Sequence, residues 1–384
     1  MGLDWSTFGY TDEQKMMRES VMDLLARELP PERIRRMDEE STYPVDAYNA
    51  LVRAGWLALP FAEADGGMGG SKRDLVVLVE ALGYHWSSMA TAYLASTIYA
   101  GQHIALNGSP YLKKTYIPKI IDGSSRMAIA LSEPEAGSDA AAIRTRAERT
   151  GDRYVVNGQK LYITCAHVAQ HLAVAVKTDV NAGHKGLSML LVPTDAKGVE
   201  IRPMETLGRR ATRANEVFFA DVEVPAENLI GEENGGWKGL MKCLNLERLC
   251  LAAAGSGSLM HVIDYALDYA MARRAFGQSV ASFQTVQHKL ADMRIMAETS
   301  RTLTWRVAEM IDAGLDPRIE TAIAKVVATE ADFRASDFGL QIMGGAGYTM
   351  AHDMQRFFRD SRVGPIGGGS NEIQKNIIAR LMGL

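Results

Sequence analysis

The chain has 384 residues, too many for one ordinary hydrophobic core, so we expect two or three packed domains. Its composition is 47% hydrophobic and 23% charged with a net charge of −4, which fits a soluble globular protein and lacks the basic excess typical of nucleic-acid-binding proteins. Three cysteines without a C-x-x-C spacing argue against a disulfide framework or a zinc site, and no uncharged apolar run suggests a membrane span.

Residues 1–122 show the hydrophobic period of helices. In TDEQKMMRESVMDLLARELP, Thr11 is expected to cap a helix with Val21 and Leu25 on its apolar stripe, and Pro30 to end it. The glycine-rich ADGGMGGS (64–71) lacks the preceding strand and following Lys-Ser/Thr of a phosphate-binding loop, which favours a connection between helices. We therefore predict an N-terminal helical domain over 1–122.

The pattern changes near Met127. RYVVNGQKLYIT predicts a hairpin that turns at Asn157-Gly158, and four further short strands are predicted from HLAVAVKT, LSMLLVP, GVEIRPM and NEVFFADVEVP. Residues 123–229 are therefore expected to form a small β-barrel or sandwich. The helical period returns over 230–384, which gives an α+β multidomain fold. A stripe in this last part predicts contact between helices: Val286, Leu290, Met293, Met296, Leu303, Val307 and Met310.

Polar and glycine-rich motifs recur along the chain. LSEPEAGSD (131–139) reads either as a polar turn or as a binding loop for a polar ring edge or a phosphate. The arginines of ARRAFG (272–277) suit a solvated helix end or a diphosphate. QIMGGAGYT (341–349) and GGGSNEIQ (367–374) add two more glycine loops, where backbone N–H groups can approach a ligand closely. Each motif alone is a weak signal, but their combination is specific.

With these motifs in this order, the chain resembles the acyl-CoA dehydrogenase family over essentially its whole length. The resemblance implies FAD held between the β domain and a C-terminal four-helix bundle, with the neighbouring subunit of a cytoplasmic homotetramer completing the site. It also implies that a base removes the α proton of an acyl-CoA while flavin N5 takes the β hydride. The products are a 2,3-enoyl-CoA and electrons for an electron-transfer flavoprotein.

The resemblance also assigns site residues. It gives flavin contacts on the two sides of the ring to Ile129, Leu131, Ser132, Gly137 and Ser138, and to Tyr162, Ile163 and Thr164. It gives contacts to the FAD of an adjacent subunit to Arg273, Phe276, Gln284, Gln341, Gly344 and Gly345. It gives the last FAD contacts to Ser370 and Glu372, and substrate contacts to Ser138, Arg248 and Arg380. Tyr162 departs from the tryptophan of many members but keeps an aromatic ring.

The position of the base distinguishes branches of the family. Many members carry a glutamate in the C-terminal glycine loop, where this chain has Gly368, and Glu372 four residues on suits a helix cap. A smaller branch, including long-chain and isovaleryl-type enzymes, keeps a glycine there and places the glutamate on an earlier helix. LNLERLCLAAAG matches that helix, and the apolar neighbours of Glu247 favour a base over a surface ion pair. The Gly368 N–H and the ribityl hydroxyl of the flavin are then expected to polarise the thioester carbonyl.

Two other functions remain open at this point. One is a crotonobetainyl-CoA reductase-like enzyme working in the reverse direction, and the other is a non-catalytic acyl-CoA-binding protein. Glu247 argues against the latter, and also against the related desulfinases and nitroalkane oxidases. The sequence does not decide the acyl chain length: Tyr84, Trp86 and Tyr93 either shorten the acyl pocket or belong to the core.

Overall fold

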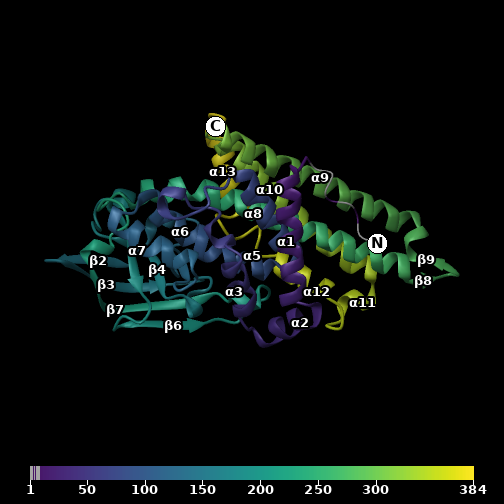
Figure 1. Ribbon diagram of the computed structural model, residues 1–384, viewed down its shortest axis with the longest axis horizontal. Coiled ribbons are helices and arrows are strands. Elements are labelled where there is room, and N and C mark those ends of the chain that lie inside the picture. The colour runs from purple at the N-terminus through teal and green to yellow at the C-terminus, as the bar shows by residue number, and fades with distance from the viewer. Residues whose placement is uncertain (1–2, 4, 6–8) are drawn as a thin grey trace.

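The computed structural model describes residues 3, 5 and 9–384. Helices come first, a β domain follows, and helices return at the end, which confirms the predicted fold class. In Figure 1 the β domain occupies the left end, and the long C-terminal helices reach out to the right. Among the described residues, none of the helices combines the length and the apolar character needed to cross a membrane.

The N-terminal part is built from short helices around an apolar core. Thr11 caps the first of them through a capping box with Gln14, as predicted, and residues 66–71 form a connection before the fourth helix. The helices are α1 (Asp12–Glu28), α2 (Pro31–Glu40), α3 (Val45–Arg53), α4 (Lys72–His85), α5 (Ser87–Leu94), α6 (Gly101–Asn107) and α7 (Pro110–Ile121). A π-helical segment, η3 (Ala95–Ala100), joins α5 to α6.

The middle part is one seven-stranded sheet in the order β1-β4-β2-β3-β7-β6, with β5 also paired to β4. Its strands are β1 (Met127–Ala130), β2 (Arg146–Thr150), β3 (Arg153–Lys160), β4 (His171–Lys177), β5 (Leu187–Pro193), β6 (Val199–Pro203) and β7 (Asn215–Pro225). β1 pairs in parallel with β4, and its last residue, Ala130, lies opposite Val174. The residues that follow β1 therefore leave the sheet beside the middle of β4. The predicted strands over 187–193 and 215–225 are confirmed.

The predicted turn at Asn157-Gly158 is wrong. Both residues lie inside β3, and the β2–β3 turn is at Gly151 and Asp152. Gly158 sits at a register irregularity opposite β7, with φ +149°, and an added Cβ would lie 2.5 Å from the Thr145 hydroxyl oxygen. The glycine therefore serves a bulge and a close approach between strands rather than a hairpin turn.

The C-terminal part is a helical bundle. Its elements are α8 (Gly236–Ala272), α9 (Gln284–Asp312), α10 (Arg318–Met343), α11 (Gly345–Tyr348), α12 (Met354–Ser361) and α13 (Asn371–Leu381), with a small hairpin of β8 (Arg274–Ala275) and β9 (Gln278–Ser279) between α8 and α9. In the predicted stripe of α9, Met293 and Val307 are fully buried and the other members are half-buried. This burial confirms that the stripe faces neighbouring helices.

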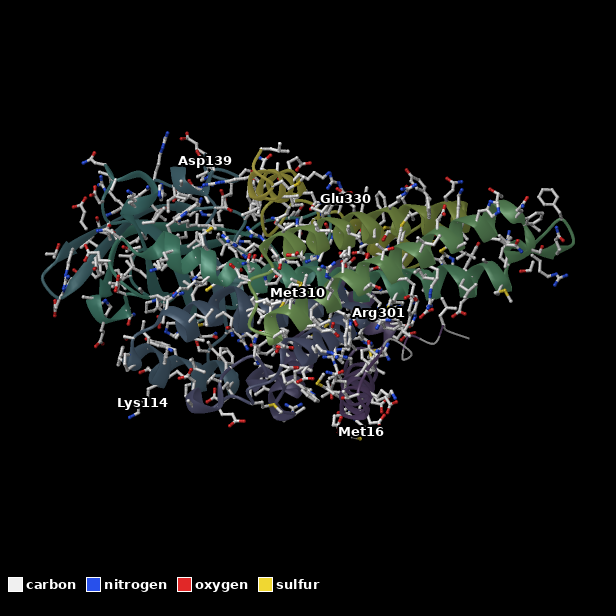
Figure 2. All side chains as sticks on the ribbon, turned by 90° about the horizontal axis from the view of Figure 1, so that it is seen from above. Met16, Lys114, Asp139, Arg301, Met310 and Glu330 are labelled. Atoms are coloured by element: carbon white, nitrogen blue, oxygen red, sulfur yellow. The ribbon has the colours of Figure 1, made fainter. Side chains whose placement is uncertain are left out.

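Buried ion pairs join the first and last parts of the chain. Arg301 of α9, labelled in Figure 2, lies where that helix meets the N-terminal helices, and its Nε is 3.3 Å from the Glu80 carboxylate of α4. Arg359 of α12 pairs with Asp38 of α2 at 2.5 Å. Breaking one member of such a pair leaves an uncompensated buried charge, so these contacts fix α4 against α9 and α2 against α12.

Candidate active site

Glu247 lies in the first third of α8 and faces the C-terminal glycine loop. Its Oε1 is 3.6 Å from the point where a Cβ at Gly368 would stand. The adjoining Leu246, Leu249 and Cys250 are buried, whereas Glu247 keeps part of its surface open. Its carboxylate accepts no hydrogen bond from the described part of the chain. Glu247 of α8 and the glycine loop before α13 therefore lie next to each other.

Burial controls the protonation of this carboxyl group. Removal from water raises the pKa of Glu247 to about 7, and the positive charges of Arg248 and Lys325 oppose that rise. Burial likewise lowers the pKa of Lys325 to about 8, with Arg248 adding to the effect. A carboxylate with a pKa near the physiological range is a stronger base than an ordinary glutamate and is still ionised in part at neutral pH.

The glycine loop has an unusual backbone and firm anchors. Gly368 and Gly369 have φ values of +65° and +80°, which glycine adopts without strain. The Gln374 Nε2 donates to both of their carbonyl oxygens, at 3.2 and 3.1 Å, and the Lys325 Nζ donates to the Gly369 oxygen at 3.0 Å. The Gly368 N–H has no acceptor among the described residues, so it remains available to a ligand.

Lys325 and Gln374 were not identified as site residues from the sequence. Lys325 is completely buried on α10 and also donates to the Asn371 Oδ1 at 2.9 Å. A signal was present: this lysine stands in the apolar run AIAKVVA, and a charge in such a run is almost never buried without a partner. The partner itself lies 44 residues away, at Gly369, which the local pattern does not show.

Glu372 occupies a different environment from Glu247. It is exposed at the first turn of α13, whose N-cap is Ser370. Hydrogen bonds from its own backbone N–H and from the Ser370 hydroxyl hold the pKa of Glu372 below its ordinary value. An exposed carboxylate of lowered pKa suits a helix cap better than proton abstraction.

The first flavin segment begins in β1 and continues into the turn after it. Ile129, Leu131 and Ser132 are half-buried, and Gly137 and Ser138 are exposed on the turn that comes next. The Leu161 N–H donates to the Ser132 oxygen at 2.9 Å, so this turn lies beside the end of β3, where the second segment begins.

A buried ion pair that the sequence analysis did not identify shapes this turn. Lys160 and Glu133 pair at 2.8 Å, and Lys160 also donates to the Leu131 oxygen at 3.1 Å. The Glu133 carboxylate also accepts hydrogen bonds from the backbone N–H groups of Arg144, at 2.5 Å, and Thr145, at 3.0 Å. Within LSEPEAGSD, the glutamate at 133 therefore supports the loop, and the residues on either side of it are left to face a ligand.

The second flavin segment, Tyr162 to Thr164, lies on the other side of that turn. Tyr162 has φ +63° and is 62% exposed, a conformation that turns its ring outward. Ile163 is buried and exchanges hydrogen bonds with Asn215 of β7, at 2.9 and 2.7 Å. Thr164 is half-buried. Two polar-edged segments with free surface, side by side at the ends of β1 and β3, fit the ring of a flavin.

The remaining predicted FAD contacts lie at the opposite end of the molecule. They are all exposed and comprise Arg273, Phe276, Gln284, Gln341, Gly344 and Gly345. Phe276, at the β8–β9 turn on the far right of Figure 1, is 94% exposed. The 25 residues of α8 between Glu247 and Ala272 span about 38 Å at the helical rise. One chain therefore does not bring this set to Glu247.

The two predicted substrate arginines differ. Arg248 is 8% exposed and points toward the glycine loop: its Nη2 is 3.9 Å from the Cβ position of Gly369, and its Nε has no partner within the described chain. Its Nη1 donates to the Asn245 Oδ1 at 3.4 Å. Arg380 is exposed near the end of α13. Figure 2 shows Asp139, which is also exposed, at the outer surface of the β domain.

The aromatic residues that the sequence offered as pocket walls belong to the core. Trp86 and Tyr93 are 2% and 0% exposed within the main apolar cluster, and the Tyr93 hydroxyl donates to the Trp56 oxygen at 3.2 Å. The Tyr84 hydroxyl donates to Asp264, more than four turns of α8 beyond Glu247. None of the three therefore shortens a pocket at the glutamate.

Comparison with known proteins identifies the family. The chain matches the acyl-CoA dehydrogenase N-terminal domain over residues 11–124, the middle domain over 128–222 and the C-terminal domain over 234–383. It belongs to the acyl-CoA dehydrogenase family. Members of this family are FAD-dependent enzymes, and similar solved structures include one with FAD.

Relatives and solved structures align over nearly the whole chain. A probable acyl-CoA dehydrogenase of Bacillus subtilis is 34% identical over 97% of this chain and 98% of its own length. A subunit of the caffeyl-CoA reductase–Etf complex of Acetobacterium woodii is 31% identical over 97% and 99%. The crystal structure of an acyl-CoA dehydrogenase from Geobacillus kaustophilus, 35% identical, superposes with a TM-score of 0.94 over 98% of this chain and 100% of that one.

Proposed function

We propose that this acyl-CoA dehydrogenase converts an acyl-CoA thioester into its 2,3-enoyl-CoA, with Glu247 taking the α proton. The observation that carries the proposal is the meeting of Glu247 and Gly368. A carboxylate with a pKa of about 7 faces a loop whose N–H group is free, so a base and a hydrogen-bond donor stand on the two sides of one small space.

Each group then has a defined part in removing the α proton. The Gly368 N–H donates to the thioester carbonyl oxygen and stabilises the negative charge that gathers there as the proton leaves. Glu247 accepts the proton, and Arg248 and Lys325 stabilise the ionised carboxylate beforehand. FAD, when bound, supplies the acceptor for the β hydride. Its ring is assigned to the segments at 129–138 and 162–164, with Ser370 and Glu372 at the start of α13 and Ser138, Arg248 and Arg380 on the substrate side.

A second copy of the chain completes the proposed site. The exposed set at the tip of α8 and the end of α10 lies too far from Glu247 to serve the same site, as the length of α8 shows. An aromatic side chain as exposed as Phe276 is suited to contact with a partner. We therefore propose a cytoplasmic homotetramer in which Arg273, Phe276, Gln284, Gln341, Gly344 and Gly345 bind the FAD of a neighbour. We also propose that the N-terminal domain ends at residue 122 and the β domain at residue 229.

An alternative function differs from this one in the direction of the reaction and in the electron partner. A relative that belongs to a caffeyl-CoA reductase–Etf complex supports an electron-transfer flavoprotein as partner, and it also keeps a reductase of the crotonobetainyl-CoA type as the second candidate. Both functions use the same proton and hydride positions in opposite directions. A non-catalytic acyl-CoA-binding protein would have no use for a half-buried glutamate of raised pKa at the loop.

An anaerobic titration tests the proposal. The FAD-loaded protein is mixed with short, long, branched and aromatic acyl-CoAs, and the flavin absorbance is followed. Bleaching by a subset of them supports dehydrogenation. A reduced enzyme that is reoxidised by enoyl-CoAs, with no bleaching by any acyl-CoA, supports the reductase instead. A flavin that responds to neither contradicts both.

A further inference from the structure

Tyr99 is an exception in a buried segment. Every residue from Trp86 to Ile104 is buried except Tyr99, which keeps part of its surface open. This segment includes η3, which packs against both β1 and α8. A side chain with open surface in such a position faces an internal space rather than the outer surface of the protein. Tyr99 was not among the residues suggested by the sequence.

The backbone around Tyr99 departs from regular helix. Residues Ala95–Ala100 form a π-helical turn, a rare geometry that re-aims side chains and is often found at functional sites. The turn is held from the side of the β domain, because the Ser96 hydroxyl accepts from the Met127 N–H at 3.0 Å at the start of β1. β1 contains Ile129, the first of the proposed flavin contacts. The position of Tyr99 is therefore tied to the flavin segment.

The surroundings of the ring place it next to the base. The charged group that acts most on the Tyr99 phenol is Glu247, and Cys250, one turn further along α8, also acts on it. From the β domain, Arg209 and Cys165 are the other neighbours, and Cys165 follows the proposed flavin contact Thr164. Burial and the Glu247 charge both raise the pKa of the phenol, so it stays neutral. Its hydroxyl forms no hydrogen bond within the described residues.

We propose that Tyr99 determines acyl specificity by filling the acyl chamber beside Glu247, so that the enzyme takes compact, short-chain acyl-CoAs. This inference rests on the proposed function. The α carbon of the substrate must lie at the Glu247 carboxylate, and the atoms beyond the β carbon must continue between α8 and the flavin segments. Glu247 and Cys165 both act on the Tyr99 phenol, and in this proposal its ring occupies that path.

Substitution of Tyr99 tests the inference. Flavin reduction by butyryl-, hexanoyl-, octanoyl- and dodecanoyl-CoA is measured as kcat/KM for the wild-type protein, Tyr99→Leu and Tyr99→Phe. We expect the wild type to favour butyryl-CoA. Tyr99→Leu should raise the octanoyl-to-butyryl ratio by at least about tenfold, since one methylene in a pocket already changes kcat/KM by about that factor. Tyr99→Phe keeps the ring and should keep the wild-type ratio.

Tyr93→Phe is the matched control. It removes a buried tyrosine hydroxyl from the same segment, one that donates to the Trp56 oxygen and does not face Glu247. The control should keep the wild-type ratio. If Tyr99→Leu does not fold, Tyr99→Trp provides the second test, because a larger ring should lower kcat/KM for hexanoyl-CoA more than for butyryl-CoA.

Three results would overturn the inference. The first is a wild-type preference for dodecanoyl-CoA, and the second is an unchanged octanoyl-to-butyryl ratio in an active Tyr99→Leu variant. The third is an octanoyl-to-butyryl ratio that Tyr99→Phe raises as much as Tyr99→Leu does. Failure of the proposed function looks different. In that case, no acyl-CoA reduces the flavin of the wild-type protein, and no ratio is obtained.

Discussion

The two ends of helix α8 present opposite environments. At one end, Glu247 is enclosed among buried side chains and faces a loop held by Lys325 and Gln374. At the other end, Arg273 and Phe276 stand in solvent on a small hairpin. A group that must change its proton affinity needs enclosure by its own chain, whereas groups that bind a neighbour's ligand must stay exposed until the chains meet. The following experiments test this contrast.

The largest effect is expected at the enclosed end. Glu247→Gln keeps the size of the side chain and its hydrogen-bonding capacity but cannot accept the α proton. Since a general base contributes about 10²–10⁴-fold, we expect kcat/KM to fall within that range while the protein keeps its FAD. Stopped-flow flavin reduction with the best acyl-CoA measures the loss. Glu200→Gln, on the exposed strand β6, is the matched control and should react as the wild type.

Full activity in Glu247→Gln, together with a large loss in Glu372→Gln, would show that the base is Glu372 of α13. The same pair of variants therefore decides between the two carboxylates near the loop.

The next effect is expected at the exposed end. In the proposed tetramer, Arg273→Ala removes a charge-assisted contact to the FAD diphosphate, and losing one such contact should weaken FAD binding by about ten- to a hundredfold. FAD content after dialysis measures this loss. Arg153→Ala removes an arginine of similar exposure from the β domain and should retain FAD.

Mixed oligomers give the sharper test of shared sites. A site that takes Glu247 from an Arg273→Ala chain and Arg273 from a Glu247→Gln chain is complete. Co-refolded mixtures of the two variants should therefore regain activity that neither has alone. A mixture no more active than its components would show that each chain builds its own site.

A smaller effect is expected from pH. The carboxyl group of Glu247 acts when ionised, and its pKa is about 7. Below pH 7, kcat/KM should therefore fall about tenfold for each pH unit, and above it a plateau should follow. Initial rates with a fixed acyl-CoA, normalised to flavin content, give the profile. A flat profile from pH 6 to pH 8 would contradict a base with this pKa.

The smallest effect is expected from Lys325→Met. Loss of this positive charge raises the pKa of Glu247 further, so the rate profile should move to higher pH. A rise of one unit would lower kcat/KM at pH 7 by about fivefold and leave the plateau at high pH in place. Lys375→Met, a lysine of α13 with an exposed pairing to Glu330, is the control and should not move the profile. A variant whose rate falls equally at every pH would show that Lys325 only supports the structure of the loop.

Local patterns predicted the elements of this fold well. The strand at Leu187–Pro193 and the cap at Thr11 follow from alternation and from side-chain chemistry within a few residues. The prediction at Asn157-Gly158 failed because the same two residues serve a bulge when a third strand packs on them. Sequence alone does not distinguish the two uses.

The site itself depends on contacts that local patterns do not contain. Glu247 was found through its apolar neighbours and a family motif, yet Lys325, which acts on it, comes from another helix. Tyr99 escaped notice because a π-helical turn shifts the side-chain register, and the hydrophobic period of an α-helix does not predict which residue such a turn exposes.

The contact between Gly368 and Leu251 restricts how this enzyme can evolve. A Cβ at Gly368 would lie 2.2 Å from the Leu251 Cδ1, and the φ of +65° disfavours any side chain there. A lineage that moved its glutamate from α8 to the loop would have to turn the Leu251 side chain aside and hold a non-glycine residue at this left-handed φ. The two positions for the glutamate are therefore separated by a change in the loop backbone as well as in Leu251, and a single substitution at Gly368 is disfavoured.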